Sequence, residues 1–174
     1  EAVRFFFFSF RPYNCHRPVR TLPKKDKKPA VLPLQIKMIT DYMLSLSEIY
    51  IENQRMNETQ QLIEAIINGI QEKKGKQIVI ADLTDIGETI CRYFIICQGN
   101  SPAQVQAIAE SIGDAARLKC QAKPVAVDGM KNAEWVAMDY IDVIVHVFLP
   151  QTRGFYDIEH LWADAQLTEI PDLD

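Results

Sequence analysis

Apolar side chains recur at helical spacing just after the first third of the chain. Five of them fall three or four positions apart, on one side of an α-helix: Leu62, Ile63, Ile66, Ile67 and Ile70. We expect Met56 to begin this helix, with Asn57 and Gln60 as a variant of the capping box. Gly75 closes it, because glycine readily adopts the left-handed conformation that ends helices.

Two further helices are predicted by the same spacing. The first begins at Ser101, with Ser101 as cap, Pro102 in the first helical position and Gln104 reaching back. Its core face contains Val105, Ile108, Ala109, Ile112 and Ala116. The second runs from about residue 152 to residue 165. One side of it carries Phe155, Ile158, Leu161, Trp162 and Ala165.

Five short apolar runs, bounded by polar or turn residues, predict buried strands. They cover residues 78–81, 93–97, 124–127, 135–139 and 143–148, and the last two are expected to form a hairpin. The order α-β-β-α-β-β-β-α predicts an α/β (α+β) sandwich, in which helices flank a single mixed five-stranded sheet. This domain covers residues 56–174.

Residues 1–55 lack a sustained period, although apolar residues between 34 and 51 approach helical spacing. We expect this segment to be a disordered or non-native upstream extension, with Met56 as the natural start. Its arginines and scarce acids are also typical of an organellar presequence, which is the alternative. Its apolar run at residues 5–8 is too short for the core of a secretory signal.

Charge divides the chain at the same place. Residues 1–55 contain 10 Lys/Arg and 5 Asp/Glu, and residues 56–174 contain 9 and 18, which gives net charges of +5 and −9. A domain at −9 repels phosphate backbones, so direct nucleic-acid binding through a basic surface is disfavoured. A basic protein partner is favoured, although excess acid also serves solubility alone.

No metal or other cofactor is expected. The four cysteines form no C-x-x-C pair, and no histidine has ligand spacing to them apart from the neighbours Cys15 and His16. Cys97 lies in an apolar run, as expected for a buried thiol in a reducing compartment. No run approaches the roughly twenty apolar residues that span a bilayer.

An enzyme remains the alternative from another class. Gly99 and Ser101 lie between a strand and a helix, and Asp139 and Asp142 follow, as in a nucleotidyltransferase-like site. Two carboxylates that share a metal on one strand face stand two residues apart. These aspartates are three apart, and Ile141 occupies the place of the second carboxylate, which weakens this interpretation.

Two side chains of the predicted hairpin are candidates for other roles. His146 alternates in phase with Ile144 and Phe148, and a lone strand histidine is usually a hydrogen-bonded sheet residue. Trp135 begins its strand after a polar loop, where its ring can anchor a protein interface. A core position for Trp135 is the alternative.

Several ordered segments resemble the Iojap, or ribosomal silencing factor, family. Three lie in residues 127–129, 133–139 and 142–148, and Arg153 with residues 156–162 follows them. The earlier residues 93–101 also fit the family's apolar strand, small turn and helix. The order, spacing and joint coverage of these segments carry the resemblance, which extends from Met56 to about residue 165.

The resemblance implies a cytoplasmic translational repressor without catalysis and with a nucleotidyltransferase-like fold. Such a protein binds ribosomal protein fourteen of the large subunit, blocks joining of the small subunit when nutrients are short, and often forms a homodimer when free. By position, it assigns Trp135, Asp139, Asp142 and His146 to the docking face. An organellar ribosome assembly factor is the variant that would require a working import signal in residues 1–55.

Ile141 departs from the family pattern, which commonly has glycine in this turn. A β-branched residue disfavours positive φ. We therefore expect the turn to take another form.

Overall fold

The computed structural model describes residues 34–174 except residues 88, 163 and 174. Residues 42–174 form one compact unit that contains all the strands described. The predicted extension over residues 1–55 lies outside the described residues as far as residue 33, as do Cys15 and His16.

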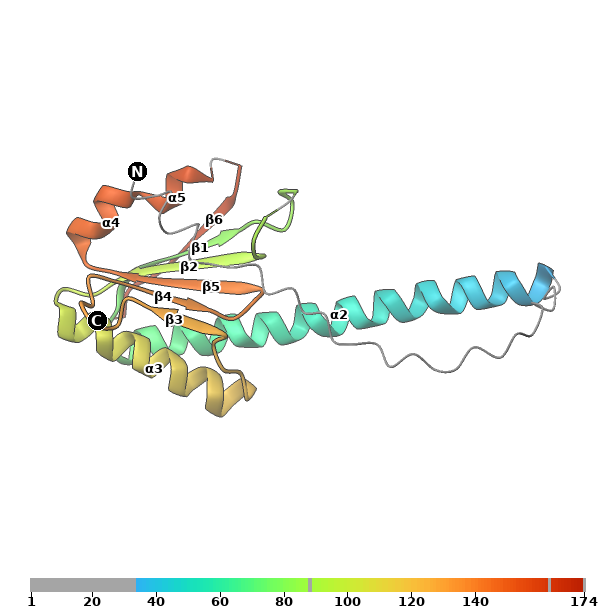
Figure 1. The fold of residues 1–174 in the computed structure, drawn as a ribbon, viewed down its shortest axis with the longest axis horizontal. Helices are drawn as coiled ribbons and strands as arrows, with labels where there is room; N and C mark the ends of the chain where they lie inside the picture. The colour runs from blue at the N-terminus through green and yellow to red at the C-terminus, as the bar shows by residue number, and fades with distance from the viewer. Residues whose placement is uncertain (1–33, 88, 163, 174) are drawn as a thin grey trace, which may run out of the picture. The chain divides into compact units, whose positions relative to one another are not determined.

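The centre of this unit is one mixed sheet in the order β3-β4-β5-β2-β1-β6 (Figure 1). Its strands are β1 (Lys76–Asp82), β2 (Tyr93–Gln98), β3 (Ala126–Asp128), β4 (Trp135–Asp139), β5 (Val143–Phe148) and β6 (Gln166–Ile170). Strands β2 and β5 are parallel, and every other neighbouring pair is antiparallel. The predicted mixed sheet and the β4–β5 hairpin are confirmed.

The predicted count of five strands is wrong, because β6 is a sixth strand at the sheet edge beside β1. Four of its five residues are exposed, so burial does not impose the apolar pattern from which strands are inferred. Strand β3 also begins later than predicted, at Ala126.

Strand β5 is buried at all six positions. Its side chains alternate between the two faces, so Val143, Val145 and Val147 join one apolar cluster. Ile144 and Phe148 join a second cluster on the opposite face. The predicted phase of this strand is therefore confirmed.

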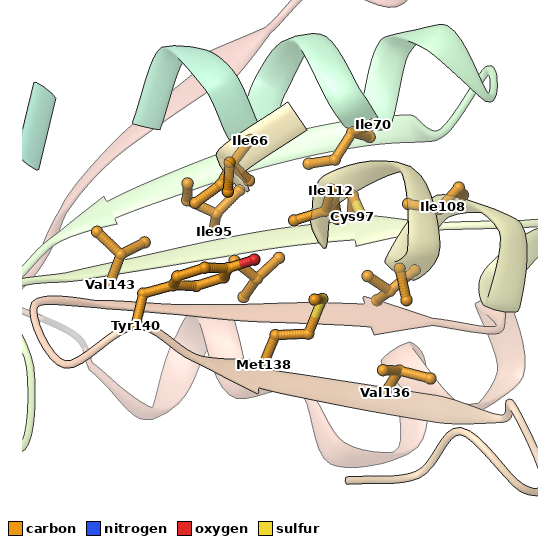
Figure 2. Packing of buried hydrophobic residues seen from close by; sticks show 14 of the residues in the cluster. Ile66, Ile70, Ile95, Cys97, Ile108, Ile112, Val136, Met138, Tyr140 and Val143 are labelled. Atoms are coloured by element: carbon orange, nitrogen blue, oxygen red, sulfur yellow. The ribbon is translucent and has the colours of Figure 1, made fainter. Parts of the chain in front are cut away.

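Helix α3 (Pro102–Cys120) and the C-terminal part of α2 (Leu34–Glu72) cover the first face (Figure 1). Figure 2 shows Ile66 and Ile70 of α2 beside Ile108 and Ile112 of α3, above the strands. Gly69 permits the close approach of the two helices, because a Cβ there would lie 2.9 Å from the Cα of Ile112.

The predicted start of α3 is confirmed. Ser101 is the N-cap, and its Oγ accepts a hydrogen bond from the Gln104 amide at 3.2 Å. Gln104 reaches back to accept from the Asn100 amide at 2.9 Å. Its side-chain amide also donates to the carbonyls of Lys73 and Lys74, which ties this cap to the end of α2.

The predicted start of a new helix at Met56 is wrong, because α2 is continuous from Leu34. Asn57 and Gln60 lie in its interior and form no capping box. Residues 34–55 contain neither glycine nor proline, so nothing local ends the helix before Met56. The apolar residues predicted at helical spacing there are exposed: Ile36, Ile39, Tyr42, Met43 and Leu46.

The single final helix predicted is also wrong. Asp157 adopts a left-handed conformation with φ of 45° and separates α4 (Pro150–Tyr156) from α5 (Ile158–Leu161). This break changes the helical phase, so Phe155 and Leu161 are exposed. Other members of the segment pack against the second cluster: Tyr156, Ile158, Trp162 and Ala165.

The β4–β5 turn contradicts the expectation for Ile141, whose φ is +75°. The Ile141 amide donates to Oδ1 of Asp139 at 2.7 Å, and the Tyr140 amide donates to the Val143 carbonyl at 2.8 Å. These bonds hold the turn closed although the β-branched residue is strained there.

Replacing Ile141 with glycine should therefore raise the free energy of unfolding. Relief of a left-handed L-residue is worth about 1–2 kcal/mol, and glycine costs about 0.5–1 kcal/mol in chain entropy, so we expect a net gain of about 1 kcal/mol in urea titrations. Ile141 is 63% exposed, so its replacement by glycine removes little buried apolar surface.

Gly129→Ala is the opposing control, because its φ is +86° and a Cβ would lie 1.9 Å from the Trp135 carbonyl oxygen. It should destabilise the protein. An Ile141→Gly variant no more stable than the wild type would contradict the strain.

Candidate partner-binding face

The second face of the β4–β5 hairpin carries most of the predicted site. Alternation along β4 directs Trp135 and Asp139 to the side of the sheet opposite α2 and α3. In the antiparallel register, Trp135 faces Phe148 and Asp139 faces Ile144. His146 lies between these two positions on β5, so three predicted residues share one face.

Trp135 belongs both to the core and to the surface. Its ring centroid lies 4.9 Å from that of Phe148 and 4.7 Å from that of Tyr156. Its indole Nε1 donates to Nδ1 of His146 at 3.2 Å. The side chain is nevertheless only half-buried, so a rigidly held aromatic surface remains accessible.

His146 is buried and packs against Trp135. It is 5% exposed, and burial lowers its pKa to about 4 because the charged imidazolium loses its hydration. The neutral ring keeps Nδ1 free to accept the indole hydrogen. The expectation of a hydrogen-bonded sheet histidine is confirmed, and its burial places it beneath the accessible surface.

Acidic side chains lie on the same face of the sheet as Trp135. Strand β3 pairs Asp128 with Ala137, and directly paired residues project to the same face. Asp128 is exposed and Asp139 is partly exposed. We call Asp128, Trp135 and Asp139 the acidic hairpin face.

Sequence reasoning missed Asp128 because a three-residue strand has too little alternation to reveal its register. The pairing of β3 with β4 fixes its side of the sheet.

Asp142 lies apart from this face, in the turn at the other end of the hairpin from Trp135. Arg55 holds both of its carboxylate oxygens, at 2.6 and 2.8 Å. Arg92 Nε lies 3.8 Å from Oδ1, and the Asp142 side chain is 18% exposed. The structure therefore separates Asp142 from the three residues with which it was predicted.

The enzyme alternative gains no support from these contacts. Asp139 serves the Ile141 turn while Asp142 is paired with Arg55, so the two carboxylates have separate roles. Gly99 is explained by packing, since a Cβ there would lie 3.1 Å from the Val105 amide nitrogen. Among the described residues, no three His, Cys, Asp or Glu side chains are grouped as metal ligands would be.

The buried cysteines have the properties of core thiols. Burial raises the pKa of Cys91 and of Cys97 to about 12, so both stay protonated near neutral pH and are poor nucleophiles.

Within the part of the chain that the structure describes, no helix has the length and apolar character to cross a membrane.

Solved structures share this fold. A crystal structure of a protein from Chromobacterium violaceum is 34% identical, with a TM-score of 0.57, and covers 60% of this chain and 85% of its own. A protein from Bacillus halodurans is 34% identical, with a TM-score of 0.55, over 64% of this chain and 99% of its own. The class is thus a mixed α+β domain with helices against one mixed sheet.

The family model described as "Ribosomal silencing factor during starvation" matches residues 56–174. A ribosomal silencing factor from Halalkalibacterium halodurans is 37% identical over 111 residues, which are 64% of this chain and 93% of the relative. The chloroplastic Iojap protein of Zea mays is 39% identical over 80 residues, which are 46% of this chain and 34% of the relative. This chain belongs to the ribosomal silencing factor family.

The burial of His146 predicts a pH dependence of stability. Because the folded pKa of His146 is about 4 and the unfolded value about 6.5, the unfolded chain binds more protons between these values. Stability should fall as pH is lowered from 6.5 to 4, by a total on the order of 3 kcal/mol. Urea titrations across this range measure the loss.

His146→Gln should flatten this slope, because its amide oxygen can accept the indole hydrogen without titrating. His160→Gln is the matched control at an exposed histidine; because Asp157 raises the pKa of His160, its removal should not flatten the slope. Equal slopes in the wild type and His146→Gln would contradict the assignment.

Proposed function

We propose that this chain represses translation by binding the large ribosomal subunit through its ribosomal protein fourteen and blocking the small subunit from joining. The mechanism is steric occlusion without catalysis. The observation that carries the proposal is the acidic hairpin face, where a half-buried tryptophan is held by a buried histidine and shares the face with two aspartates. Membership of the silencing factor family supports it.

The geometry suits a protein partner. The rings of His146, Phe148 and Tyr156 and a hydrogen bond to His146 hold Trp135 in place, so little conformational entropy is lost when it docks. Aromatic anchors of this kind supply much of the binding energy at interfaces. Asp128 and Asp139 add negative charge, which favours a basic surface and speeds its encounter.

The whole domain reinforces this preference. Residues 56–174 have a net charge of −9, which steers the domain toward basic proteins and away from bare nucleic acid. We propose that this domain carries the repressor function in the cytoplasm and forms a homodimer when free. Residues 1–55 are then an addition to it.

The acidic hairpin face can be tested with paired charge changes. Asp128→Asn/Asp139→Asn should weaken co-sedimentation with large subunits on the order of tenfold and reduce its salt dependence, because two attractive charges are lost. The asparagine introduced at position 139 retains an oxygen that can accept from the Ile141 amide. The same samples, given small subunits last, should recover subunit joining.

The matched control is Glu110→Gln/Asp114→Asn, which changes net charge equally on exposed positions of α3. This control should bind and block as the wild type does. If both double variants weaken binding equally, the effect is one of net charge alone. If Asp128→Asn/Asp139→Asn binds as the wild type does, the acidic hairpin face is not part of the interface. A wild type that binds large subunits without blocking joining would favour an assembly role.

A further inference from the structure

The end of the β4–β5 hairpin is occupied by a charge network from α2. Arg55 makes a two-pronged ion pair with Asp142 at 2.6 and 2.8 Å. Arg92, at the start of β2, lies 3.8 Å from the same carboxylate and pairs with Glu52 one turn earlier on α2. Two arginines therefore surround the one carboxylate of this turn.

Arg55 lies immediately before the family-matched region, which begins at residue 56, whereas Asp142 lies inside it. Asp142 lies in the turn that follows Asp139, the member of the acidic hairpin face at this end of the hairpin. Arg55 thus places a positive charge beside a face that is otherwise acidic.

We propose that Arg55 is an intramolecular competitor for Asp142, which it withholds from a basic side chain of the ribosomal partner and so weakens docking. This inference rests on the proposed function, since it concerns the same partner. It assigns a tuning role to a residue outside the family-matched region.

The pair has the properties that a displaceable contact needs. The Arg55 side chain is 48% exposed, so water reaches the guanidinium and competes with Asp142 for it. A cleft of about 660 Å³, lined in part by Arg55, Tyr140 and Asp142, adjoins the pair. A partner cation can therefore approach the carboxylate and take the place of Arg55.

The competing arrangement would have Arg55 merely hold Asp142 in position for the partner. The two arrangements predict opposite effects on docking when Arg55 is removed. Loss of a competitor strengthens docking, because the carboxylate is freed for the partner. Loss of a positioning residue weakens docking, because the carboxylate is no longer held toward the partner.

The test compares the dissociation constants with which the wild-type chain and Arg55→Gln bind isolated large subunits. We expect Arg55→Gln to bind about threefold to tenfold more tightly. Arg117→Gln is the matched control, because it removes an exposed ion pair with Asp114 on α3 and changes net charge equally. It should bind as the wild type does.

Asp142→Asn gives the second readout. In its background, Arg55→Gln should lose its tightening effect, since the withheld carboxylate is gone. Three results would overturn the competitor role of Arg55. They are weaker or unchanged binding of Arg55→Gln, tightening equal to that of Arg117→Gln, and tightening that persists with Asp142→Asn. Failure of the wild type itself to bind large subunits would instead overturn the proposed function.

Discussion

The arrangement of the unit depends on strand β5, which is buried along its whole length between a parallel and an antiparallel neighbour. Its alternation separates two environments. Valines contact the aliphatic core under α2 and α3, while Ile144, His146 and Phe148 face the other side. A polar group can be buried there only with a hydrogen-bond partner, which is why His146 and Trp135 are coupled. The rigidity of the candidate face follows from this single strand.

The sequence predicts best where burial imposes a period. Strands β4 and β5 and the cap of α3 match their predicted bounds, because both faces of the hairpin and the Ser101 cap have strict local requirements. Strand β6 escaped prediction because an exposed edge carries no such pattern. The break at Asp157 was missed because a left-handed aspartate resembles any other polar helix residue in sequence.

The site was predictable only in part for the same reason. Trp135, Asp139 and His146 share a face because they keep the period of two, whereas Asp142 lies in a turn where the period ends. Asp128 and Arg55 depend on long-range pairings, with β4 and with the hairpin turn. No local pattern encodes such contacts. The left-handed Ile141 likewise reflects a turn held by its neighbours against local preference.

Site-specific photo-crosslinking tests the central claim, that the acidic hairpin face docks on ribosomal protein fourteen, most directly. A photoreactive residue would replace Asp128 on this face or Glu110 on α3, each in the full chain bound to large subunits. The account predicts a crosslink to ribosomal protein fourteen from position 128 and none from position 110. A crosslink from position 110 to that protein, or from position 128 to a different ribosomal component, would contradict it.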